Sequence, residues 1–203
     1  MRETISFTDS EAWNGGTVDA LMYFGQSKVN DAITIFNALW KNNNLRGPYR
    51  SNRIEPQKQT PIIKPDYTDD GCEHLYGIYT HIDGKKMNFV QKVVFDEYGL
   101  WVYAGVTVGS LPSEWNVGAY PDNIDEGIHV WEECLLEELR TICHSLYKAK
   151  PIKAAIYGWL TVSEIDTLLE AVDGSIPDHQ GYPIDIWIDG VNHFYPASIS
   201  SGS

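Results

Sequence analysis

Residues 74–109 read HLYGIYTHI-DG-KKMNFVQKVVF-DEYG-LWVYAGVTVG, and this stretch decides the fold class. Its three longer segments alternate apolar and polar residues with the period of two that is typical of strands. The short segments between them, DG (83–84) and DEYG (96–99), contain the residues that favour tight turns between neighbouring strands. The stretch therefore predicts an antiparallel meander of three strands.

Further elements are expected on both sides of this meander. Strands at 4–7 and 20–25 and a helix over 28–41 are predicted before it. A helix at about 126–147, a strand at 151–159, a helix over 161–174 and a hairpin over 182–196, turning at Asp189-Gly190, are predicted after it. Strands in runs with helices between them predict an α+β fold, an antiparallel or mixed sheet with about three helices packed mainly on one face.

The chain has the size of one domain, and residues 1–203 are expected to form it. Its 203 residues are 43% hydrophobic, which is enough to build a core. Residues 41–73 contain four prolines and no periodicity, so they are expected to form a long basic loop or arm. Six bases lie between positions 41 and 64 of this arm, against the single acid Glu55.

Charge is distributed very unevenly along the chain. Residues 1–92 hold eleven acids and eleven bases, whereas residues 93–203 hold seventeen acids and four bases, so the second part carries the whole net charge of −13. A surface of one sign repels nucleic acids and anionic membranes and attracts basic partners. The expected partner is therefore a protein with a basic surface. The plainer interpretation, that acidic residues only aid solubility, stays open.

The stretch HVWEECLLEELR (129–140) concentrates four of the glutamates. On a helical wheel, an apolar stripe through Leu135 and Leu139 faces the sheet, and Glu133 and Glu137 face solvent. Glu132 lies beside the apolar stripe, one turn after His129. A buried carboxylate needs a partner, so Glu132 is expected to contact a backbone group, a base or a metal ion.

No arrangement of residues announces a reaction. Neither Cys72 with His74 and His81 nor the neighbours Cys143 and His144 repeat the paired spacing of zinc ligands. The chain has no P-loop, nucleophile elbow or HExxH motif. We therefore expect no catalytic residues, no bound metal and no cofactor. Two alternatives stay open: a small metal-dependent enzyme that uses Glu132, His129 and a residue of the arm, and a structural or oligomeric module.

The three cysteines form no disulfide framework, the N-terminus has no apolar signal stretch, and no apolar run is long enough to span a bilayer. A cytoplasmic protein without a membrane partner is expected.

The order of NALW (37–40), LRGPYR (45–50), the meander, WEECLLEELRTICHSLY (131–147) and PIKAAIYGW (151–159) resembles that of small acidic bacterial immunity proteins encoded beside polymorphic or secretion-delivered toxins. This resemblance lies in the architecture and not in a diagnostic motif. It implies a cytoplasmic, aromatic-rich inhibitor that occludes the basic groove of a toxin, such as a nuclease. The residues expected to bind are Glu133, Glu137, Asp122, Asp125, Glu126, Trp115, Tyr120, Asp185, Trp187 and Asp189.

Overall fold

A single eight-stranded sheet organises the molecule. The computed structural model describes residues 7–67, 73–112, 115, 130–159, 161–175 and 182–197. The strands follow one another in the order β2-β3-β4-β5-β1-β6-β7-β8, and all neighbouring strands are antiparallel. Their bounds are β1 Thr17–Tyr23, β2 Leu45–Tyr49, β3 Glu73–Thr80, β4 Lys86–Phe95, β5 Leu100–Thr107, β6 Ala154–Trp159, β7 Ile184–Ile188 and β8 Val191–Tyr195.

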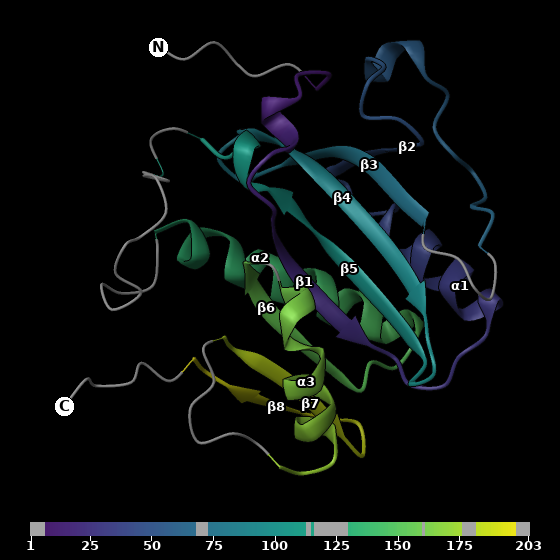
Figure 1. Cartoon of the computed structure of the whole chain (residues 1–203), viewed down its shortest axis with the longest axis vertical. Helices are drawn as coiled ribbons and strands as arrows, with labels where there is room; N and C mark the ends of the chain where they lie inside the picture. The colour runs from purple at the N-terminus through teal and green to yellow at the C-terminus, as the bar shows by residue number, and fades with distance from the viewer. Residues whose placement is uncertain are drawn as a thin grey trace.

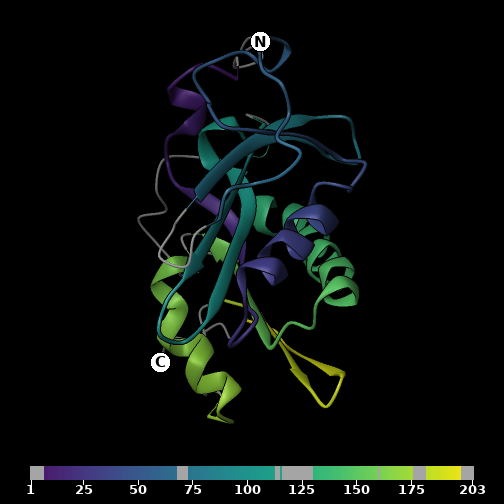
Figure 2. The ribbon, with the colours of Figure 1, turned by 90° about the vertical axis from the view of Figure 1, so that its right-hand side faces the viewer.

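Helices cover both faces of this sheet (Figure 1). The helices α1 (Val29–Leu39) and α2 (Val130–Ala149) pack side by side on one face, and α3 (Ile165–Val172) covers the other face over β6 and β7. The side view separates the two layers clearly (Figure 2). Four short 3-10 turns complete the described part: η1 (Glu11–Trp13), η2 (Pro56–Lys58), η3 (Val108–Ser110) and η5 (Thr161–Glu164). The predicted α+β class is confirmed.

Strand β6 shows why both layers are needed. Ala155 and Tyr157 point into the core beneath α1 and α2, whereas Ala154 and Ile156 point into the smaller core beneath α3. All four residues are buried. A strand buried on both faces carries apolar residues at every position instead of alternating ones, and this explains the continuous apolar run AAIYGW.

Several predicted elements have other bounds in the structure. The meander is confirmed as β3, β4 and β5, and the hairpin turn at Asp189-Gly190 is confirmed with φ values of 50° and 83°. The arm is wrong as a structureless loop, because β2 lies within it and pairs with β3. The glycine and proline of LRGPY hide the alternation of this short strand.

The predicted strand at 4–7 falls almost entirely outside the described residues, and Phe7 itself lies in a turn. The predicted helix over 161–174 is in fact η5 followed by α3. Among the described residues, no helix combines the length and the apolar character that crossing a membrane requires.

Candidate functional site

Helix α3 exposes a row of carboxylates. Asp166, Glu170 and Asp173 are spaced by four and three residues, which places them on one side of the helix. All three are exposed, whereas Leu168 and Ala171 on the opposite side are buried against the sheet. The helix thus directs its acids into solvent from the face of the sheet that lies opposite α2.

The turn between β4 and β5 adds more acids at the same end of the sheet. Asp96 and Glu97 are both exposed there, next to Tyr98, which is 47% exposed. The side chain of Tyr23 links this turn to α3. Its hydroxyl donates a hydrogen bond of 2.9 Å to the carbonyl oxygen of Tyr98. The pKa of Tyr23 is raised by burial and then by the carboxylates of Asp96 and Asp173, so two acids distant in sequence act on one phenol.

We name these five carboxylates, Asp96, Glu97, Asp166, Glu170 and Asp173, the acidic end. In the part of the chain that the structure describes, none of them forms an ion pair, because the ion-paired acids lie elsewhere. A base does lie nearby: Lys153 packs its aliphatic part near Gly25 and donates its backbone N–H to the carbonyl of Tyr23. The acidic end therefore has uncompensated charge available to attract cations.

Asp185 is found in a different place from the one predicted. Its side chain is fully buried on β7, beneath α2. The guanidinium of Arg140 donates two hydrogen bonds, from Nε at 3.0 Å and from Nη2 at 3.3 Å, and the hydroxyl of Tyr157 donates a third at 2.7 Å. The expectation that Asp185 lies on a binding surface is corrected, because both of its oxygens are already engaged inside the protein.

The buried Asp185 cluster also includes Cys143 and His144. Burial raises the pKa of the Cys143 thiol to about 12, so this thiol stays protonated at neutral pH. His144 Nε2 lies 3.8 Å from the carboxylate of Asp185, and its ring meets the ring of Trp187 edge-on. Both neighbours lie near Asp185, but Cys143 is fully buried and its thiol stays protonated, so it lacks the accessible thiolate of a nucleophile.

The two tryptophans expected as partner contacts are buried. Trp187 stacks on Tyr147 with 5.3 Å between the ring centroids. Trp115 meets the ring of His81 edge-on at 5.0 Å, and the ammonium group of Lys85 lies 5.9 Å from its ring. Both therefore act as packing residues, which corrects the expectation of exposed anchors.

The other predicted binding residues divide into two groups. Glu137 is exposed, with 80% of its side chain accessible, and accepts a 3.5 Å hydrogen bond from Arg140 as the helical spacing suggests. Asp189 is exposed in the β7–β8 turn. Four others and one side chain lie outside the described residues: Tyr120, Asp122, Asp125, Glu126 and the side chain of Glu133. His129 and the side chain of Glu132 lie outside as well.

Sequence reasoning missed a buried carboxylate at the centre of the sheet. Asp19 on β1 lies between Gly105 of β5 and Gly158 of β6, and a Cβ atom at Gly105 would come within 2.5 Å of the Cα and Cβ of Asp19. The hydroxyls of Thr17, at 2.6 Å, and Thr161 donate hydrogen bonds to its two oxygens. Burial raises the pKa of Asp19 to about 6. Its position in the mixed run TVDALMY gave no signal of this.

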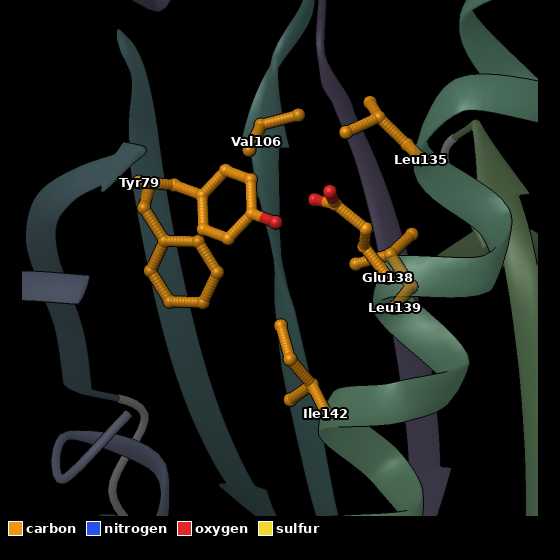
Figure 3. Close-up of a pocket in the computed structure, with 7 residues that line it drawn as sticks. Tyr79, Val106, Leu135, Glu138, Leu139 and Ile142 are labelled. Carbon is orange, nitrogen blue, oxygen red and sulfur yellow. The ribbon is translucent and has the colours of Figure 1, made fainter. Parts of the chain in front are cut away.

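A second missed carboxylate, Glu138, faces a small cavity between α2 and the sheet (Figure 3). Its Oε1 lies 3.4 Å from Nε2 of His81, whose Nδ1 lies 2.8 Å from Asp83, while Oε2 is buried and has no hydrogen-bond partner among the described residues. Burial raises the pKa of Glu138. The cavity has a volume of about 10 Å³, which is room for about one water molecule and not for a substrate.

No protein-family model, no curated protein and no solved structure matches this chain. The described residues also contain no group of three or more histidine, cysteine, aspartate or glutamate side chains that could hold a metal ion. The geometry of the acidic end is therefore the basis for a functional interpretation.

Proposed function

We propose that this protein binds a basic protein partner through the acidic end and thereby occludes a cationic groove of that partner. The toxin-immunity setting suggested by the resemblance of the sequence fits this role. The observation that carries the proposal is that α3 and the β4–β5 turn both expose carboxylates: Asp96 and Asp173 act on the same phenol, Tyr23, and none of the five acids forms an ion pair among the described residues.

The physical basis is long-range attraction followed by local contact. Unpaired carboxylates on one surface raise the rate at which a cationic partner arrives, and they engage lysine and arginine side chains once it has docked. Tyr98, exposed at 47% beside Asp96 and Glu97, supplies an aromatic contact of the kind that contributes strongly to interface energies.

The acids that were expected to share one binding surface lie on opposite sides of the sheet. Glu137 belongs to α2, which packs on one face of β6, and the acids of α3 project from the other face. One partner cannot dock flat on both. The proposed surface is therefore the acidic end. Glu137 lies outside it and serves as a control position in the experiment below.

The alternative of a small metal-dependent enzyme has less support. Its proposed residues, Glu132 and His129, lie where the structure does not describe side chains. The cavity beside Glu138 has room for only about one water molecule.

The test begins with the protein encoded by the neighbouring gene, because toxin and immunity genes are adjacent. This protein is co-expressed with the wild-type chain, and both co-purification and protection of cell growth are measured. A triple reversal at the acidic end, Glu97→Lys with Glu170→Lys and Asp173→Lys, spares Asp96, whose side chain accepts the turn hydrogen bonds of Tyr98 and Gly99. The matched control reverses three exposed acids elsewhere, Glu11→Lys, Asp66→Lys and Glu137→Lys.

We expect the wild type and the control to co-purify with the partner and to protect growth, and the acidic-end variant to lose both. Equal binding by both variants would overturn the assignment of the acidic end. A neighbouring protein that neither binds nor harms growth would overturn the immunity setting.

A further inference from the structure

We propose that β8 is a self-association edge, at which two copies of this chain pair their β8 strands and extend the sheet across a two-fold axis. β8 is the last strand in the sheet order, so one of its two sides has no neighbouring strand among the described residues. This inference rests on the backbone of the β7–β8 hairpin and is independent of the acidic end.

Within the described residues no strand pairs with the outer side of β8, and the edge is partly apolar. Val191 is 57% exposed, Phe194 is 38% exposed, and Ile188 at the end of β7 is 53% exposed. The segment Val191–Tyr195 contains no proline, lysine or arginine. Native edge strands usually carry such residues, or a bulge or a covering loop, to prevent pairing with another chain.

The hairpin geometry determines which backbone groups point outward. Asp189 and Gly190 form a two-residue turn with positive φ at both positions, and Ile188 pairs with Val191 directly beside it. Hydrogen-bonded and non-hydrogen-bonded pairs alternate in an antiparallel ladder. Val191, His193 and Tyr195 therefore direct their N–H and C=O groups toward β7, and Asn192 and Phe194 direct theirs away from the sheet.

The outward backbone groups of Asn192 and Phe194 can pair with those of the same two residues in a second copy. With His193 on the two-fold axis, Asn192 lies opposite Phe194 of the second copy, and Phe194 lies opposite Asn192 of the second copy. Each pair exchanges two N–H···O bonds, which gives four hydrogen bonds. A shift in one direction places Asn192 opposite Pro196, which has no N–H, and a shift in the other direction places Phe194 opposite Gly190 of the turn. The symmetric register is thus the one that uses every outward group.

The opposite edge of the sheet is closed, which favours a dimer over a filament. Strand β2 contains Pro48, and its pairing with β3 shifts register between Arg46 and Tyr49. The arm returns along it, and the N–H of Ile62 donates a 2.8 Å hydrogen bond to the carbonyl of Pro48. Among the described residues a segment covers the β2 edge and none covers β8, so pairing of identical β8 edges would form a closed two-fold assembly.

The charges of the hairpin permit this contact. No residue of β8 is an acid or a lysine or arginine, and Asp185 on the neighbouring strand is bound by Arg140. The two Asp189 side chains would be eight strand positions apart, about 27 Å. This exceeds the Debye length of about 8 Å at physiological ionic strength, so these two acids repel one another weakly.

The first test is sedimentation of the full chain from low to high micromolar concentration. We expect the mass to rise from the 22.9 kDa of one chain toward twice that value. Asn192→Pro removes an outward N–H without touching the ladder to β7, and it is expected to remain a monomer throughout. Asn192→Thr keeps the N–H and is expected to associate like the wild type. A wild type that stays monomeric at every concentration overturns the proposal.

A cross-link tests the register even if the proline variant fails to fold. On the axis, a non-hydrogen-bonded pair places the Cα atoms about 4.5 Å apart, within the range of a disulfide. His193→Cys is therefore expected to form a covalent dimer under mild oxidation, whereas Val191→Cys, whose copies are about 14 Å apart, is not. Equal cross-linking of both variants contradicts the register.

Salt separates this proposal from the proposed function. Because each copy carries a net charge of −13, self-association is expected to strengthen as salt rises, whereas binding of a basic partner is expected to weaken. If the chain dimerises but does not bind the basic partner, the β8 proposal stands and the proposed function is overturned. A monomer that binds the basic partner does the reverse.

Discussion

The two ends of the sheet, at β2 and at α3 with β8, differ in both charge and closure. At the β2 end, the arm carries exposed bases, among them Lys41, Arg53 and Lys58, and it covers the edge strand that contains Pro48. At the other end, in the described part of the chain, the carboxylates of α3 are exposed without ion pairs and β8 has no strand on its outer side. The charge asymmetry along the sequence is therefore an asymmetry in space, with the opposite charges at opposite ends and not neutralising each other.

The buried acid Asp185 and the exposed acids of α3 can be compared in the same way. Inside, Asp185 has a bidentate partner in Arg140. Outside, the acids of α3 have none among the described residues. Arg140 thus neutralises the buried carboxylate, whereas the exposed acids of α3 are left available.

The largest expected effect tests this internal neutralisation. Arg140→Met keeps the length of the side chain and removes its charge, so Asp185 stays buried without a base. The free energy of unfolding is expected to fall by about 3–5 kcal/mol, as measured by urea denaturation. The control at the basic end, Arg53→Met, changes an exposed side chain and is expected to alter stability by less than about 0.5 kcal/mol.

A second substitution distinguishes loss of the base from loss of packing. Combining Arg140→Met with Asp185→Asn removes the stranded charge and is expected to recover part of the lost stability. If the double variant loses as much free energy of unfolding as the two single variants together, the ion pair does not contribute to holding α2 against β7.

A smaller effect is expected at Asp19, a buried carboxylate between the two ends that is held by hydroxyls and not by a base. Its pKa is raised from 3.8 to about 6, so the folded state binds this proton more tightly than the unfolded state. The contribution of Asp19 to stability is therefore most favourable below about pH 4 and falls as the pH rises through 6. The difference amounts to about 3 kcal/mol at most.

Asp19→Asn removes this titration and keeps an acceptor oxygen for one of the two threonine hydroxyls, while its NH2 group replaces the other oxygen. The variant is expected to gain stability over the wild type as the pH rises from 4 to 8, measured by thermal denaturation across that range. A stability difference between the two proteins that stays constant with pH contradicts the shifted pKa.

The fold was readable from the sequence where one side of a strand faces a different environment from the other. Strand β3 alternates between buried and less buried residues, whereas β5 is buried along its whole length and was recognisable from the DEYG turn before it. Asp189-Gly190 identified the final hairpin. Strand β2 was missed because Gly47 and Pro48 interrupt its short pattern. In IDIWIDG, alternation indicated an exposed polar face, yet α2 covers that face and Arg140 binds Asp185 from 45 positions away.

The candidate site was readable only in part. The exposed stripe of α3 follows from helical spacing, but the only acids in the last third of the chain named among the expected binding residues were Asp185 and Asp189. The meeting of the α3 acids with Asp96 and Glu97 depends on the strand order β4-β5-β1-β6, which no local pattern reveals. The ten acids of residues 93–139 likewise gave no indication that Glu137 and the α3 acids lie on opposite faces.

The central claim is that the acidic end, and not acidity in general, recruits the partner. It is tested most directly by the association rate of the basic partner, measured against salt concentration for the wild type and for the two triple reversals defined above. Circular dichroism first checks that all three proteins are folded. The wild type and the Glu11, Asp66 and Glu137 control are expected to associate at similar rates that fall steeply with salt. The Glu97, Glu170 and Asp173 variant is expected to associate at least about tenfold more slowly at low salt, with a flatter dependence, because steering is screened over about 10 Å at 0.1 M. Equal slowing by both reversals, or a wild-type rate that is indifferent to salt, would contradict the claim.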